Sequence, residues 1–168
     1  GLNEREQKTY QELSKKLASL SAKFSDNVLD ATDQYTLNIT DFDRLKGLPD
    51  AIIAEAKSKA KSMHKTGWSF TLKAPCWVPF MESCIDRGLR QEMYRAYVTR
   101  ASDCGAPEYD NSKIIIDILG ARCKKAKLLG FDSFAHLSFA TKMAVEPKRA
   151  LDLMTELSLK ARSRAESE

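Results

Sequence analysis

The segment YQELSKKLASLSAKFSDNVLDA, from Tyr10 to Ala31, decides the fold of this chain. Its apolar residues recur every three or four positions, which places them on one face of a helix. The same stripe could form a coiled-coil seam, but it extends over only about three heptads and mixes Tyr, Phe and Ala with Leu. We therefore predict a long helix that packs within the chain. The stripe consists of Tyr10, Leu13, Leu17, Leu20, Phe24, Val28 and Ala31.

Two short segments downstream alternate apolar and polar residues, which is typical of strands. They are Leu37–Thr40 and Trp68–Leu72, and both have the period of two that a half-buried strand requires. Between them, Pro49 is expected at the first position of a helix that extends to about Met63, because proline has the backbone angle needed there. We predict a small antiparallel ribbon with a helix between its two strands.

Five further helices are expected after the second strand, from proline, capping residues and apolar spacing. Pro75 and Pro79 should end the strand and begin the first of them, Asp110 or Asn111 should cap the third, and Asp132 the fourth. The predicted fold class is mainly α, with about seven helices and a two-stranded ribbon in one domain, 1–168. The expected segments are Pro75–Cys84, Leu89–Ala101, Ser112–Leu129, a helix carrying Phe134, Leu137 and Phe139, and a last helix opened by Pro147.

Composition and charge indicate an ordered domain without a nucleic-acid partner. The 168 residues are 43% hydrophobic and 30% charged, and the net charge of +4 comes from interspersed residues of both signs. The densest basic cluster is Arg122, Lys124, Lys125 and Lys127, close before Gly130. Cations favour the last turns of a helix, so we prefer this interpretation to a phosphate-binding patch.

The cysteine pattern and the absence of long apolar runs indicate in which cellular compartment the protein is found. Four scattered cysteines without a C-x-x-C pair do not resemble a disulfide scaffold, so a reducing compartment is predicted. No apolar run approaches the roughly 18 residues of a membrane span, and the start has no signal-peptide pattern, so we expect no membrane association. A transit peptide, if one existed, would precede Gly1. The cysteines are Cys76, Cys84, Cys104 and Cys123.

Metal and catalytic motifs are missing from the sequence. Its two histidines, His64 and His136, lie far apart, whereas an H-E-x-x-H zinc site needs two imidazoles one helical turn apart with a Glu between them. Three aspartates at positions 26, 30 and 33 lack the glycine turn and the terminal Glu of a calcium loop. We predict no metal site and no catalytic residue in this chain.

Four motifs in collinear order do resemble a known family. They are FSDNVLDAT (Phe24–Thr32), YRAYVTRAS (Tyr94–Ser102), KLLGF (Lys127–Phe131) and ATKMA (Ala140–Ala144). Together they resemble the N-terminal helical region of the thimet oligopeptidase family of zinc metallopeptidases, in particular its oligopeptidase A branch. The resemblance extends over essentially the whole chain.

The resemblance implies a function in peptide hydrolysis. Members of this family cleave short peptides with a zinc held by H-E-x-x-H and a more distal Glu, all downstream of the matching region. The corresponding helical region forms one wall of a channel that admits short unstructured peptides. By this resemblance the chain would confine short peptides, and zinc would be bound in a catalytic domain absent from it, so the chain alone is expected to be inactive.

The motif YRAYVTRAS supplies the candidate substrate-binding residues. Arg can pair with a terminal carboxylate and Tyr can stack or donate a hydrogen bond. The alternative is packing alone, because Met93 and Val98 share helical spacing with the two tyrosines, and helix aromatics usually serve cores. By the same reasoning, Asp26, Asn27 and Asp30 should bond to neighbouring helices rather than to a ligand. The candidates are Tyr94, Arg95, Tyr97 and Arg100.

Two hypotheses follow. The first is the N-terminal part of a zinc oligopeptidase, located in the cytoplasm, or in a plastid or mitochondrion if a transit peptide preceded Gly1. The second is a shortened, non-catalytic interaction or scaffold protein of the same family. An exposed apolar face would then bind a protein partner or a second copy, with Trp77, Phe80 and Met81 as its candidate residues. The last helix has no stop signal before its polar end, which is typical of a helix that continues.

Overall fold

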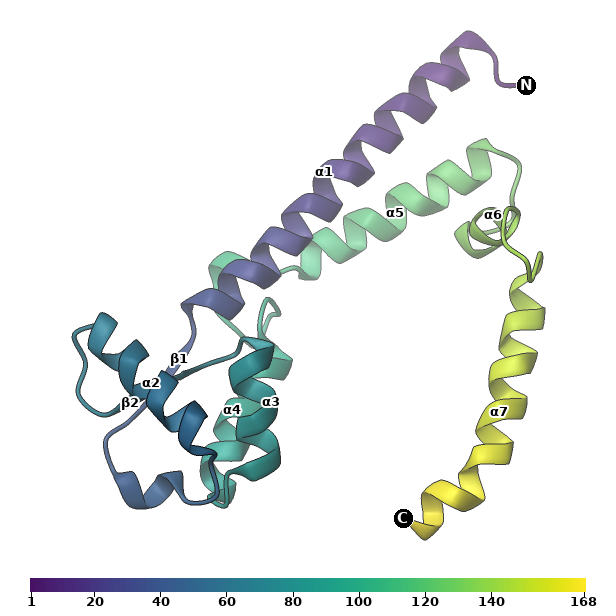
Figure 1. Cartoon of the computed structure of the whole chain (residues 1–168). Helices are drawn as coiled ribbons and strands as arrows, with labels where there is room; N and C mark the ends of the chain where they lie inside the picture. The colour runs from purple at the N-terminus through teal and green to yellow at the C-terminus, as the bar shows by residue number, and fades with distance from the viewer. The chain divides into compact units, whose positions relative to one another are not determined.

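The computed structural model describes residues 1–168 and is mainly helical, with seven α-helices and one two-stranded antiparallel sheet (Figure 1). This confirms the predicted fold class. Two 3-10 turns, η1 (Phe42–Leu45) and η2 (Pro107–Tyr109), complete the structure. The elements are α1 (Glu4–Gln34), β1 (Thr36–Ile39), α2 (Asp50–Ser62), β2 (Trp68–Thr71), α3 (Ala74–Ser83), α4 (Arg87–Thr99), α5 (Ser112–Leu128), α6 (Phe134–Phe139) and α7 (Pro147–Ser167).

The residues group into two compact units. The central unit is Ala22–Ile115, and the terminal unit combines Gly1–Ser21 with Ile116–Glu168. Helices α1 and α5 each contribute residues to both units. The predicted single domain 1–168 stays a prediction.

Helix α1 confirms the long helix expected from the apolar stripe. It begins with a reciprocal pair of hydrogen bonds, in which the Glu6 backbone N–H donates to Asn3 Oδ1 at 2.9 Å and the Asn3 N–H donates to Glu6 Oε2 at 2.8 Å. This capping box satisfies two amides that the first helical turn leaves free. The N-x-x-E spacing in the sequence is therefore the start signal of the helix.

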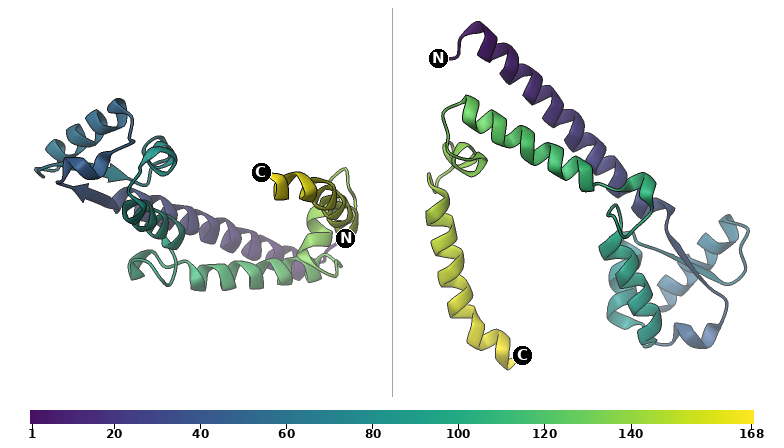
Figure 2. Two further views of the ribbon diagram at one scale, coloured as in Figure 1. Left: turned by 90° about the horizontal axis from the view of Figure 1, so that it is seen from below. Right: turned by 180° about the vertical axis from the view of Figure 1, so that it is seen from behind.

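The sheet pairs β1 with β2 in the antiparallel direction, as predicted. Leu37 is opposite Phe70, and Asn38 is opposite Ser69. Ser69 Oγ donates to Asn38 Oδ1 at 2.8 Å, so the one buried hydroxyl of the pair is satisfied across the sheet. Helix α2 packs on β2, and α3 packs on β2 and α4 (Figure 2). The register thus turns Leu37 and Phe70 into the core of the central unit.

The core of the central unit lies where β2 meets α3. The rings of Phe70 and Phe80, both fully buried, meet edge to face with centroids 4.9 Å apart. Two buried aromatic rings in this geometry add packing energy beyond their area. The other buried apolar residues of this core are Leu37, Ile39, Leu45, Leu48, Ala56, Leu72, Cys76, Cys84, Leu89 and Met93.

Two predicted helix starts differ in detail, whereas Pro75 lies in the first turn of α3 as expected, with Pro79 inside that helix. Pro49 is the N-cap of α2 rather than its first helical residue. The cap of α6 is Ser133, whose hydroxyl accepts from the His136 N–H, and Asp132 is not used. Serine and aspartate are both good N-caps, so neighbouring positions compete and the backbone path decides between them.

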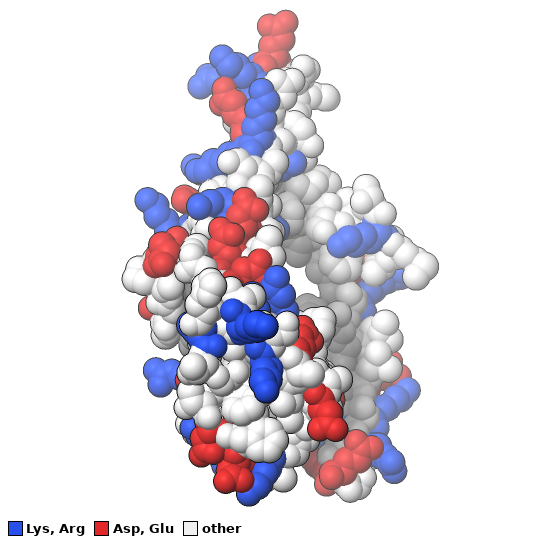
Figure 3. Space-filling model, turned by 60° about the vertical axis from the view of Figure 1, so that its left-hand side comes forward, with Lys and Arg blue, Asp and Glu red and all other residues white.

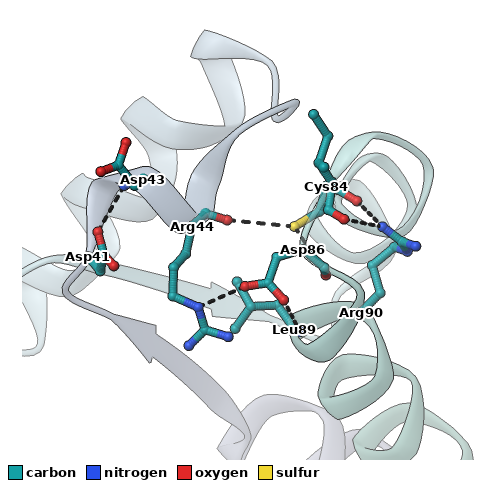
Figure 4. Close-up of polar contacts among 8 residues, drawn as sticks. Asp41, Asp43, Arg44, Cys84, Asp86, Leu89 and Arg90 are labelled. Atoms are coloured by element: carbon teal, nitrogen blue, oxygen red, sulfur yellow. Dashed lines mark hydrogen bonds and ion pairs between the residues drawn. The ribbon is translucent and has the colours of Figure 1, made fainter.

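The start of α4 is held by a carboxylate that sequence reasoning missed. Asp86 Oδ1 accepts from the Leu89 N–H at 3.1 Å, and Asp86 Oδ2 accepts from Arg44 Nε at 2.8 Å (Figure 4). Arg44 and the helix amides lower the pKa of Asp86. Nearby, Arg90 donates to the carbonyls of Cys84 and Ile85. These contacts tie the chain before α4 to η1 and to the helix itself.

A buried amide pair joins the end of the central unit to α1. Asn27 Nδ2 donates to Asn111 Oδ1 at 2.9 Å, and Asn111 Nδ2 donates to the Phe24 carbonyl at 3.1 Å. Asn111 therefore bonds to α1, while Asp110 accepts from the Ser112 N–H at 2.8 Å at the start of α5. The expectation that Asn27 bonds to another segment is confirmed.

In the terminal unit, the basic cluster serves helix contacts. Lys125 Nζ donates to Ser14 Oγ at 3.1 Å and lies 4.5 Å from the centroid of the Tyr10 ring. The Arg122 guanidinium lies 5.0 Å from the Phe134 ring.

Charges of both signs are interspersed over the face of the molecule shown in Figure 3. This is the arrangement expected of solvated helix surfaces.

We predict that Asn111→Ala destabilises the protein by about 1–3 kcal/mol, because it removes two hydrogen bonds and leaves buried Asn27 with both amide atoms unpaired. Oδ1 of Asn27 already has no partner. The measurement is the free energy of unfolding in urea, followed by circular dichroism. Gln91→Ala, at an exposed site on α4, is the control and should change it little. Equal stability of Asn111→Ala and the control would contradict the assignment.

A second prediction concerns pH. Because the pKa of Asp86 is lower in the folded protein than its ordinary value near about 3.9, the ionised carboxylate stabilises the fold above that value. This stabilisation disappears as the pH falls through the lowered pKa. Asp86→Asn should therefore be less stable than wild type at pH 7, and the difference should shrink between about pH 4 and pH 2. Thermal unfolding midpoints across this range test it, and a difference independent of pH would refute it.

Candidate functional site

Helix α4 carries Tyr94, Arg95 and Tyr97, and Arg100 is its C-cap, but the four predicted substrate-binding residues lie in different surroundings. Tyr94 is 54% exposed, and Arg95 is also exposed. Tyr97 and Arg100 are half-buried and lie together. The packing alternative is correct for Met93, which is fully buried, and for Tyr97, which packs against the core. It is wrong for Tyr94, which the structure leaves largely in solvent.

The half-buried pair belongs to a stack of three side chains. The Trp77 ring of α3 lies 4.1 Å from the Tyr97 ring, with 20° between their planes. The Arg100 guanidinium carbon lies 3.6 Å from the centroid of the same Tyr97 ring. Two groups this close to one ring must occupy its opposite faces, so Tyr97 is enclosed between Trp77 and Arg100. A planar cation on an aromatic face is attracted by the ring quadrupole.

Arg100 is incompletely satisfied within the protein. Its Nη1 donates to the Tyr97 carbonyl at 2.7 Å, at the end of α4. Its Nε is buried and has no hydrogen-bond partner. The ion pairs of the central unit join other residues, so no Asp or Glu neutralises Arg100. The guanidinium therefore keeps an uncompensated positive charge in a half-buried place.

A cavity of about 320 Å³ lies beside Arg100 within the central unit. Tyr35 lines this cavity. Burial and the charge of Glu92 raise the pKa of its phenol, which therefore stays protonated at neutral pH. A protonated phenol and a guanidinium are both hydrogen-bond donors. The cavity thus combines donor groups with a partly apolar wall. It is lined by Ala31, Gln34, Tyr35, Leu72, Ala96, Thr99, Arg100, Ala101, Gly105, Ala106 and Tyr109.

Sequence reasoning missed most of this site. Tyr35 comes from the segment between α1 and β1, and Tyr109 from η2, so no spacing in the sequence connects them with α4. Trp77 was expected in an exposed partner face with Phe80 and Met81. This prediction of an exposed face is wrong, because Phe80 is fully buried and the other two side chains pack against the core. Only the YRAYVTRAS motif pointed to this region beforehand.

A larger open groove of about 980 Å³ lies between α1 and α5 in the terminal unit. Its rim carries Glu6, Glu12 and Lys124, and Lys16 on the rim lies 3.9 Å from Asp117. Charges of both signs thus face one another across the groove, and the ion pair neutralises part of them. This groove is therefore better explained as the space between two neighbouring helices than as a binding site.

No three His, Cys, Asp or Glu side chains gather closely enough to hold a metal ion. His64 follows α2 in a left-handed conformation with φ of 54°, and His136 Nδ1 lies 2.9 Å from Ser133 Oγ in α6. The two histidines belong to different units. All four cysteines are free thiols, and burial raises the pKa of Cys84. None of the helices has the length and apolar character needed to cross a membrane.

Comparison with known proteins connects this geometry to a family. The family model described as peptidase family M3 matches residues 80–168, a range that includes α4 and Arg100. The oligopeptidase A proteins of Salmonella typhimurium and Escherichia coli are each 44% identical over 100% of this chain and 25% of their own length. Organellar oligopeptidase A of Arabidopsis thaliana is 39% identical over 89% of the chain and 19% of its own length.

The chain therefore spans about a quarter of the length of the first two relatives. The similarity to these two proteins extends over all the helices and strands described above. Because the family model matches more than half of the residues, including the helix with the candidate site, the chain belongs to peptidase family M3.

Proposed function

We propose that this chain is the N-terminal, channel-forming part of a zinc-dependent oligopeptidase that hydrolyses short peptides. The observation that carries the proposal is the 44% identity to oligopeptidase A over the whole chain. In this proposal the chain recognises and confines the peptide, and the cleavage chemistry belongs to residues outside these 168. A helical unit that excludes folded proteins would restrict the substrates to short, extended chains.

The residues present do not fit the zinc site that the family implies. His64 and His136 are followed by Lys65 and Leu137, so neither begins an H-E-x-x-H helix. No group of three ligand side chains lies close together either. Zinc would therefore be held elsewhere in a complete peptidase, and no catalytic step is assigned to side chains of this chain.

The contribution of this chain would be made by α4. Tyr94 and Arg95 are exposed on the helix and available to a peptide. Tyr97 orients Arg100 through the stack with Trp77. Arginine pairs well with carboxylates because its planar fork can donate two parallel hydrogen bonds. We therefore assign substrate contacts to Tyr94, Arg95 and Arg100, and a positioning role to Tyr97.

The proposed location is a reducing compartment inside the cell. Two of the relatives are named "Organellar oligopeptidase A, chloroplastic/mitochondrial" and "Probable cytosolic oligopeptidase A". Four free cysteines, two of them buried, suit such a compartment because thiols are kept reduced there. The cytoplasm, a plastid or a mitochondrion would each meet this condition.

A chimera tests the proposed function. Residues 1–168 replace the matching quarter of E. coli oligopeptidase A, and cleavage of a fluorogenic short peptide is measured with and without a zinc chelator. We expect chelator-sensitive hydrolysis by the chimera and none by the isolated chain supplied with zinc. Cleavage by the isolated chain would overturn the proposal. A chimera that is folded and zinc-loaded but inactive would overturn it as well.

A second candidate function, a non-catalytic interaction protein, is favoured by the surface of α7. This helix buries none of its residues, and its apolar side chains include Leu153, Met154 and Leu157, each more than half exposed. Charged residues pair along the helix, as Lys148 does with Asp152 and Lys160 with Glu156. Leu153, Met154 and Leu157 are left uncovered, and two copies could bury them by packing α7 against α7.

Self-association of the purified chain tests this candidate. If α7 pairs between copies, sedimentation velocity should show a dimer that increases with concentration, and Leu157→Glu should shift it to monomer by burying a charge in the contact. Glu156→Gln, on the charged side of the same helix, is the control and should leave the dimer unchanged. A monomer at all concentrations would exclude self-association through α7.

A further inference from the structure

The starting point is the unbalanced charge of Arg100. A guanidinium that is half-buried loses hydration, and this loss is normally offset by a carboxylate or by a full set of hydrogen bonds. Arg100 has one hydrogen bond, to the Tyr97 carbonyl, and its Nε is buried without a partner. The protein supplies no carboxylate to it. Because Nε is enclosed, an anion bound from outside would pair with the Nη groups of the guanidinium, of which only Nη1 has a partner in the protein.

The guanidinium is also held in place before any ligand arrives. It lies 3.6 Å from the Tyr97 ring centroid, and that ring is stacked on Trp77. The next residue, Ala101, is buried and has a left-handed φ of 53°. Its carbonyl accepts from the Asn111 N–H at 3.1 Å, which fixes the backbone immediately after Arg100. A side chain ordered in advance loses less entropy when it binds.

The cavity beside Arg100 has the size and lining for a small terminal group. Its volume of about 320 Å³ is near the lower end of ligand pockets. Tyr35, Tyr109 and Thr99 are further polar side chains of the lining; the Thr99 hydroxyl donates to the Arg95 carbonyl at 2.8 Å, and Tyr35 stays protonated at neutral pH because burial raises its pKa. Leu72 and four alanines supply an apolar wall. Such a mixture suits a carboxylate attached to a small apolar side chain.

We propose that this cavity binds the C-terminal carboxylate of a short peptide, with Arg100 as its anion-binding residue and the apolar wall around the last side chain. That the carboxylate belongs to a peptide rests on the proposed function. The carboxylate itself follows from the guanidinium, whose planar fork matches the two oxygens of that group. The proposed site needs only residues of the central unit.

The test is peptide binding to the full 168-residue chain, measured by isothermal titration calorimetry. Four ligands are compared: N-acetyl-trialanine with a free C-terminus, the same peptide as its C-terminal amide, an amidated peptide with Asp in the middle, and acetate. We expect the free acid to bind about ten-fold or more tightly than its amide, a difference of about 1.4 kcal/mol. Tight binding of the Asp peptide would instead assign the site to side-chain carboxylates. Equal binding of acid and amide, or binding by none, would overturn the proposal.

Two variants locate the site. Arg100→Gln should reduce binding of the free acid to the level of the amide. Arg87→Gln makes the same change of charge at an exposed position at the start of the same helix, and should bind as wild type does. If Arg100→Gln does not fold, Thr99→Val and methyl NMR shifts of Ala96 and Ala106 on adding the acid replace it, since these residues line the cavity. Undiminished binding by a folded Arg100→Gln, or no shift at these methyl groups, would refute the assignment.

This outcome and that of the chimera are distinguishable. Loss of carboxylate binding would leave hydrolysis by the chimera intact, and the peptide would then be held by other contacts. An inactive chimera whose 168-residue part still binds the acid would retain the carboxylate site and remove its connection with hydrolysis.

Discussion

The edge-to-face contact between Phe70 and Phe80 is the interaction on which the rest of the central unit depends. Phe70 belongs to β2 and Phe80 to α3, so the contact sets how the helix lies on the sheet. Helix α3 in turn packs on α4 and carries Trp77, which positions Tyr97. Two aromatic contacts, linked by the backbone of α3, therefore lead from the core to Arg100. Close packing of this kind transmits a displacement, because the interior has few voids to absorb it.

The two ends of α4 differ in the kind of charge that holds them. At its start, Asp86 accepts from the helix amides and from Arg44, which is the favourable position for a negative group. At its end, Arg100 donates to the Tyr97 carbonyl, where a positive group is favoured. The first charge is paired within the protein and the second is not. The charge at the start of this helix is therefore neutralised by an ion pair, whereas the charge at its end has no carboxylate partner within the protein.

The chain belongs to peptidase family M3, and the proposed function connects these features with peptides, while no group of side chains in the chain is arranged to bind zinc. A division between a helical region that recognises the substrate and a metal centre that cleaves it separates two physical tasks. Recognition needs donors and apolar walls that are ordered in advance. Cleavage needs a metal with an open coordination position. In the proposed function, the residues around Arg100 would perform the first task.

The sequence by itself determined the helices, the two strands and the family. Apolar spacing in Tyr10–Ala31, alternation in Trp68–Leu72 and the proline that begins α7 act over a few residues, so they can be recognised without a structure. The choice of Ser133 over Asp132 as a cap already depended on the backbone path. Local rules therefore predicted the elements better than their exact ends.

Only the tertiary structure decided which side chains meet. Trp77, Tyr97 and Arg100 come from α3 and α4, and the cavity beside them adds Tyr35 and Tyr109 from segments far apart in the sequence. The pairing of Asn27 with Asn111 has the same origin. Contacts of this kind depend on how helices pack, and packing is set by the complementary shapes of the complete core. For that reason the motif around α4 could be recognised beforehand, whereas the cavity beside it could not.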